Sequence, residues 1–131
     1  MGEKQKPIVY SCSGCSNLAQ MAHELALNMD LDGIAEMSCV SGVIGKVKPI
    51  MRMAQSGRPI IAIDGCSLKC TKACLDASGL NVSMHFDLSE YGFEKRSKEE
   101  NIFSEGCIAM NRVYEELWKA GYTIKSDDKS Y

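Results

Sequence analysis

One short apolar run constrains the fold of this chain more than any other feature. The segment PIIAID at 59–64 follows a glycine and an arginine, and no polar residue interrupts it before Asp64. A strand with one solvated face would alternate apolar and polar residues, whereas a strand covered on both faces of a parallel sheet is continuously apolar. The run therefore predicts a central strand of a parallel sheet.

Three further β-rich segments alternate with helical patterns. The predicted strands cover residues 7–12, 33–40, 59–66 and 80–86, and the second has the weakest pattern. The predicted helices end at Gly33, Gly57, Gly79 and Gly121. The third of these helices is expected over about 67–78 and the fourth over about 104–120. The segment SGVIGK at 41–46 indicates a loop. This order predicts an α/β, Rossmann-like three-layer sandwich, with a mainly parallel sheet of about four strands and helices on both faces.

The length and charge of the chain limit its organisation and its partners. Its 131 residues fit a single domain over 1–131, with loose tails expected at 1–6 and 125–131. The apolar runs are too short to cross a membrane, and the N-terminus lacks the apolar core of a signal peptide, so a cytoplasmic protein is expected. A formal charge of −2 without a basic stripe argues against a nucleic-acid partner.

The chain contains seven cysteines, which in a reducing compartment favour metal binding or thiol chemistry over a disulfide framework. Ligands of parallel sheets bind beyond the carboxyl ends of the strands. Five cysteines are predicted to lie at that edge: Cys12, Cys15, Cys39, Cys66 and Cys70. The other two, Cys74 and Cys107, are expected to pack as small apolar residues.

The spacing of these cysteines suits zinc. Zn²⁺ takes about four thiolate or imidazole ligands in a tetrahedron, and local pairs are commonly separated by two to four residues. Cys12 and Cys15 fit this spacing, and so do Cys66 and Cys70, with Cys70 expected one turn into a helix. The nearby helix N-termini and lysines lead us to expect thiols with lowered pKa values.

Several motifs together resemble a known family. They are CSGCSN at 12–17, SCVSGVIG at 38–45, IDGCSLKC at 63–70 and FDLSEYGFEK at 86–95. Across residues 7–96 the chain resembles the DGC domain family, which is named for its Asp-Gly-Cys motif and is described as zinc-binding. The resemblance implies a zinc ion held by Cys12, Cys39, Cys66 and Cys70, the same set that the strand ends select. Cys15 is either a fifth candidate ligand or a neighbour of the site.

Low-pKa thiols serve metal binding and nucleophilic sulfur chemistry alike, so the sequence leaves three hypotheses open. The first is a zinc-binding protein in metal or sulfur handling or sensing, with a small sulfur-containing or anionic ligand as a further partner. The second is a thiol oxidoreductase or sulfur-transfer protein, with Cys12 or Cys66 as the nucleophile and Cys15 or Cys70 as the resolving thiol. The third is a protein-interaction module that the metal rigidifies.

Overall fold

The four predicted strands form one parallel sheet. The computed structural model describes residues 5–14, 16–93 and 103–122; residues 1–4 and 125–131 of the predicted tails lie outside them. The strands are β1 (Ile8–Ser11), β2 (Glu36–Met37), β3 (Ile60–Asp64) and β4 (Met84–Asp87), in the spatial order β2-β1-β3-β4. All five residues of β3 are buried and the strand pairs with a neighbour on each side, which confirms the interpretation of PIIAID.

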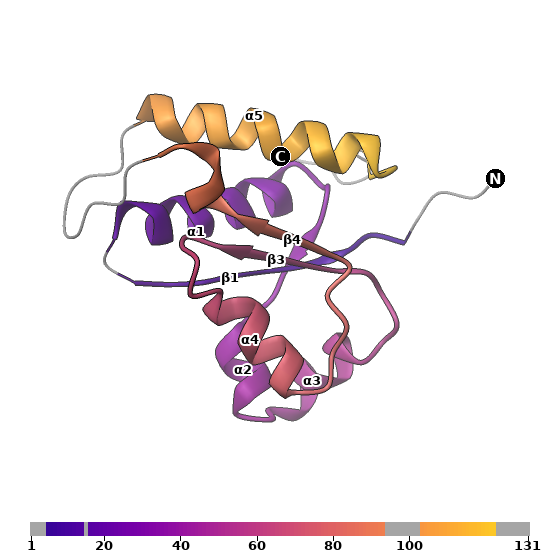
Figure 1. Cartoon of the computed structure of the whole chain (residues 1–131). Coiled ribbons are helices and arrows are strands. Elements are labelled where there is room, and N and C mark those ends of the chain that lie inside the picture. Colours follow the sequence, from indigo (N-terminus) through magenta and orange to yellow (C-terminus); the bar gives the residue numbers. More distant parts are fainter. Residues whose placement is uncertain (1–4, 15, 94–102, 123–131) are drawn as a thin grey trace.

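Helices cover both faces of this sheet (Figure 1). One face carries α1 (Asn17–Leu31) and α5 (Phe103–Lys119), and the other carries α2 (Val40–Ile44), α3 (Lys48–Ala54) and α4 (Cys70–Ala77). Side chains alternate along each strand, so that Val9 packs under α1 while Ile8 and Tyr10 pack on the opposite face. The predicted α/β three-layer architecture is therefore confirmed.

The predicted helix ends coincide with residues of positive φ. Gly33 and Gly79 follow α1 and α4 with φ of 75° and 78°, a left-handed conformation that glycine adopts without steric cost. Helix α5, the longest of the described helices, buries Val113 and Leu117 in the core on its face of the sheet. Within the described part of the chain, no helix combines the length and the apolar character needed to cross a membrane.

The predicted loop over SGVIGK is wrong for its first four residues, because residues 41–44 belong to α2. Strand β2 is only two residues long and ends at Met37, so Cys39 is the N-cap residue of α2 rather than the end of a strand. A glycine-containing helix of five residues has little stability of its own. Here Gly42 packs closely against Ile50 of α3, since a Cβ atom at Gly42 would lie 2.8 Å from the Ile50 side chain.

The start of α4 also differs from the prediction. The helix begins at Cys70 instead of about residue 67, and residues 66–69 form a turn in which the Lys69 N–H donates to the Cys66 carbonyl at 3.1 Å. Lys69 adopts the left-handed conformation, with φ of 55°. Leu68, which lies in this turn, is therefore 74% exposed. Cys66 and Cys70 are joined by a turn and are not successive positions on one helix.

Candidate thiol site at the carboxyl edge of the sheet

Two cysteines meet where β1 and β3 end. Ser11 pairs with Ile63, and the next N–H of the chain, that of Cys12, donates to the Ile63 carbonyl at 3.1 Å. Strand β3 ends at Asp64; the next residue, Gly65, donates its N–H to the Cys12 sulfur at 3.2 Å, and Cys66 follows it. Parallel strands thus bring together cysteines that lie more than fifty residues apart, as the sequence predicted.

A single pocket gathers three of the predicted ligands. Its volume is about 310 Å³, and Cys12, Cys66 and Cys70 all line it. Cys12 and Cys66 are half-buried and Cys70 is exposed, and all three are free thiols. The remainder of the lining comes from the loop after β1, the first turn of α1 and the turn before α4. The pocket therefore combines three sulfur donors with access from solvent.

Gly65 permits the close approach of two segments at this pocket. A Cβ atom at this position would lie 2.8 Å from the carbonyl carbon of Leu18 and 2.9 Å from the nitrogen of Ala19. Both atoms belong to the backbone at the start of α1, which cannot move aside as the end of a side chain can. Only glycine lets the loop between β3 and α4 lie this close to α1. Sequence reasoning assigned no such role to Gly65.

Asp64 fixes the start of α4 and hence the position of Cys70. Its carboxylate is 1% exposed and accepts backbone hydrogen bonds from Thr71 at 2.7 Å and Lys72 at 3.2 Å. These N–H groups belong to the first turn of the helix, where intrahelical acceptors are lacking. The carboxylate thus replaces the side-chain cap that Lys69 does not provide.

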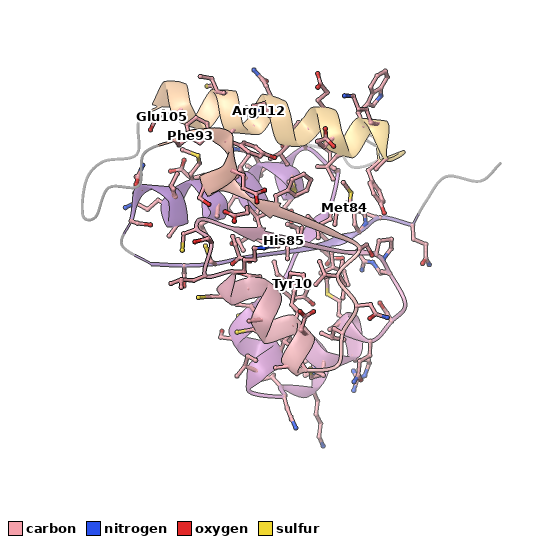
Figure 2. The ribbon with its side chains drawn as sticks, viewed as in Figure 1. Tyr10, Met84, His85, Phe93, Glu105 and Arg112 are labelled. Carbon is pink, nitrogen blue, oxygen red and sulfur yellow. The ribbon has the colours of Figure 1, made fainter. Side chains whose placement is uncertain are left out.

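His85 contacts the same carboxylate from β4. Its Nε2 lies 2.8 Å from Oδ2 of Asp64, and its side chain is only 16% exposed. Figure 2 shows His85 on the side of the sheet that α4 covers, which agrees with the burial of its neighbour Phe86 on the other face. His85 is packed within the structure, and it also orients Asp64.

Burial raises the pKa of the Cys12 thiol, so the expected lowered pKa is wrong for this residue. The Gly65 N–H acts in the opposite direction, while the negative charges of Asp64, Cys66 and Cys70 raise the pKa further. Ionised thiols in this pocket therefore repel one another. A bound cation would remove that repulsion, and soft thiolate donors suit zinc among the common divalent ions. By their chemistry, these thiols suit the zinc ion that the sequence predicted.

Cys39 lies in a second pocket, of about 540 Å³, which Cys12 also lines. Its thiol is exposed, and its sulfur is 2.8 Å from the Ser41 hydroxyl. The hydrogen bond from Ser41, followed by that from the Gly42 N–H, holds the pKa of Cys39 below its ordinary value. The predicted lowered pKa is thus confirmed here. Ser41 was missed because the segment was interpreted as a loop.

The remaining cysteines of the described residues, Cys74 and Cys107, line neither of these two pockets. Cys15 lies outside the described residues. Cys74 is one turn beyond Cys70 on α4, and Cys107 lies on α5 against a different cavity, next to Met21 and Met110. Among residues 5–14, 16–93 and 103–122, no three cysteine, histidine or acidic side chains stand close enough together to hold a metal ion without rearrangement.

Comparisons with known proteins agree with the motifs. The family model described as the DGC domain matches residues 8–113. The chain is 48% identical over 113 residues to the anaerobic and virulence modulator AnvM of Pseudomonas aeruginosa, and the alignment covers 85% of this chain and 82% of that protein. No solved structure matches the chain.

Proposed function

The chain belongs to the DGC domain family, and on that premise we propose that it binds a zinc ion through thiolates at the carboxyl edge of its sheet. One observation carries the proposal. Cys12, Cys66 and Cys70 come from three segments and line one pocket, where the charges of Cys66 and Cys70 raise the pKa of Cys12. A divalent cation in this pocket would offset the thiolate charges that raise the pKa of Cys12.

The proposed ligands are Cys12, Cys66 and Cys70, with Cys39 and Cys15 as the candidates for the fourth position. Cys39 lines the adjoining pocket on which Cys12 also borders. The Gly65 N–H donates to the Cys12 sulfur, and Asp64 holds the start of α4, where Cys70 lies. These two residues would therefore orient Cys12 and Cys70 without contacting the ion. When bound, zinc would neutralise thiolate charge and lock the turn at residues 66–69.

We assign the metal to handling or sensing rather than to stabilising the fold. Two apolar cores already fill the sheet faces, and neither includes Cys66 or Cys70. Cys70 is exposed, so a bound ion would remain open to exchange. The similar protein AnvM is named as a modulator, which favours a regulatory role. Free thiols also require a reducing compartment such as the cytoplasm.

Metal analysis of anaerobically purified protein tests the proposal, together with thiol titration before and after chelation. We expect about one zinc per chain, which masks at least three thiols until the chelator is added. Cys66→Ser and Cys70→Ser should each abolish retention of the metal, whereas Cys107→Ser on α5 should retain it. Metal-free protein whose thiols all react equally with and without chelator contradicts the proposal.

Thiol redox chemistry is the second candidate function, and the structure changes its nucleophile. The sequence favoured Cys12 or Cys66, but burial raises the pKa of Cys12. Cys39 combines exposure with a lowered pKa, which are the two properties of a reactive thiol. Selective alkylation of Cys39 in metal-free protein at neutral pH would support this function. Equal labelling of all the cysteines would oppose it.

A further inference from the structure

Strand β4 forms one edge of the sheet. It pairs with β3 on one side, and no strand of the described residues pairs with its other side. Alternate residues of a strand direct their backbone N–H and C=O groups to opposite sides, so the free side of β4 presents unpaired groups. The residues of β4, MHFD, include neither proline nor lysine, which commonly protect an edge from pairing. This edge is therefore able to accept a further strand.

A groove follows this free edge. Its volume is about 470 Å³, and all four residues of β4 line it, together with the 3₁₀ turn η1 (Leu88–Tyr91) and the second half of α5. Figure 1 shows α5 along the face of the sheet beside β4, so the helix forms the second wall. On this face Phe86 is buried and Met84 is half-buried. A chain laid beside β4 would direct every second side chain into this edge groove, toward α5.

The edge groove is acidic. Apart from the imidazole of His85, its ionisable walls carry four carboxylates and one guanidinium, those of Asp87, Glu90, Glu115, Glu116 and Arg112. The guanidinium is already engaged, because Arg112 donates to the Tyr91 carbonyl at 3.0 Å and lies 4.4 Å from the centroid of the Tyr91 ring. Lys119 lies 3.4 Å from Glu115, but both side chains are exposed and such a pair is weak. The groove therefore attracts cationic side chains.

The charge of the edge groove selects its occupant. Two copies of this chain paired through β4 would share a two-fold axis, so the same carboxylates of both copies would meet across it. Like charges that face each other across paired strands are destabilising. A strand from another protein with lysine or arginine side chains meets these carboxylates with the opposite charge. Its basic residues would stand at every second position, because only those side chains face α5.

We propose that the edge groove binds an extended segment of a partner protein, with lysine or arginine at alternate positions, as an additional strand beside β4. Backbone hydrogen bonds to the free side of β4 supply affinity, and the spacing of the basic side chains supplies specificity. The aliphatic stems of those side chains cover Met84, while their charged ends reach the carboxylates of α5. No residue of the edge groove lines either thiol pocket, so this binding needs no metal ion.

Binding of synthetic peptides to the full chain tests the proposal by fluorescence polarisation at low ionic strength. A labelled peptide of sequence Lys-Thr-Lys-Thr-Lys-Thr should bind, whereas Glu-Thr-Glu-Thr-Glu-Thr should not. The lysine peptide with every backbone nitrogen methylated keeps its charges and loses its N–H donors. It should bind about tenfold more weakly, since each lost backbone hydrogen bond weakens binding several-fold.

Charge variants and NMR place the peptide on the molecule. The double variant Glu115→Gln with Glu116→Gln should bind the lysine peptide about fivefold more weakly, because two exposed ion pairs are lost. Its matched control is Glu24→Gln with Asp76→Asn, which removes the same charge from exposed positions outside the edge groove and should bind as wild type does. Circular dichroism confirms that both variants are folded. In ¹⁵N-labelled wild-type protein, the peptide should shift the amide signals of β4 and of the second half of α5.

Four results would overturn the proposal. The first is no binding of the lysine peptide, and the second is a set of amide shifts that leaves β4 unaffected. The third is equal binding of the methylated peptide, which would show attraction by charge without an added strand. The fourth is a dimer in sedimentation whose interface amides are those of β4, which would assign the edge to a second copy of this chain.

Discussion

The carboxylate of Asp64 accepts the backbone N–H of Thr71 at 2.7 Å, although Thr71 lies seven residues further along the chain. This bond joins the end of β3 to the start of α4. It also sets where α4 begins, and Cys70 is the first residue of that helix. The first residue of the Asp-Gly-Cys motif therefore positions a thiol that lies outside the motif.

Removing this carboxylate should destabilise the protein. Asp64→Ala leaves two N–H groups of α4 without their acceptor and His85 without its partner. We expect a loss of about 2 kcal/mol in the free energy of unfolding, since a lost cap and an orphaned buried donor each cost about 1 kcal/mol or more. Urea unfolding followed by circular dichroism measures it. Asp76→Asn, at an exposed pair with Lys72, is the control and should change stability little.

Gly65→Ala should destabilise the protein although it adds only one methyl group. The added methyl group would meet the backbone of Leu18 and Ala19 at under 3 Å, so the loop after β3 must move away from α1. Overpacking of this kind costs about 1–3 kcal/mol, and the movement should weaken zinc retention. Gly106→Ala on α5 is the matched control, because nothing lies within 4 Å of its added methyl group. That control should unfold at an equal or higher urea concentration. Equal stability of the Gly65→Ala and Gly106→Ala variants would contradict the claim that the close approach to α1 requires glycine at position 65.

Lys69 adopts a left-handed conformation that costs a non-glycine residue about 1–2 kcal/mol. Lys69→Gly should therefore stabilise the protein slightly, by up to about 1 kcal/mol, because the relief of strain exceeds the extra freedom of glycine in the unfolded chain. Ala73→Gly, at an exposed position inside α4, should instead destabilise it by about 1 kcal/mol. Thermal unfolding of the two variants should move in opposite directions from wild type.

The alkylation rates of Cys39 and Cys12 should both rise with pH, with midpoints displaced in opposite directions from that of an ordinary cysteine. Only the thiolate is alkylated, so the midpoint of the rate against pH follows the pKa of each thiol. The midpoint for Cys39 should lie below that of an ordinary cysteine, and the midpoint for Cys12 above it. Ser41→Ala should move the Cys39 midpoint upward and slow its alkylation at neutral pH. Ser83→Ala, whose hydroxyl accepts the N–H of Ile60 at the amino end of β3, should leave it unchanged.

Much of the fold follows from residues that act locally. The run at 59–64 needs cover on both faces, and this requirement alone places β3 inside a parallel sheet. Parallel strands then share their carboxyl edge, so Cys12 and Cys66 could be placed together from the sequence. The glycines after the helices mark their ends because the chain must turn left-handed there.

The parts that could not be predicted depend on contacts between distant segments. The short helix α2 rests on the packing of Gly42 against Ile50. Its presence ends β2 early and places Cys39 in the second pocket, away from Cys66 and Cys70. Similarly, α4 starts at Cys70 because Asp64 caps it from the previous strand. Helical periodicity carries no information about either contact. The division of the cysteines between two pockets was therefore outside the reach of sequence patterns.

X-ray absorption at the zinc edge of anaerobically purified protein tests the central claim most directly. Zinc bound by these cysteines should show a shell of at least three sulfur atoms at about 2.3 Å. Each of Cys66→Ser and Cys70→Ser should remove sulfur from that shell or empty the site, while Cys107→Ser should leave the spectrum unchanged. A first shell of nitrogen and oxygen alone, or a sulfur shell that persists in both Cys66→Ser and Cys70→Ser, would contradict the account.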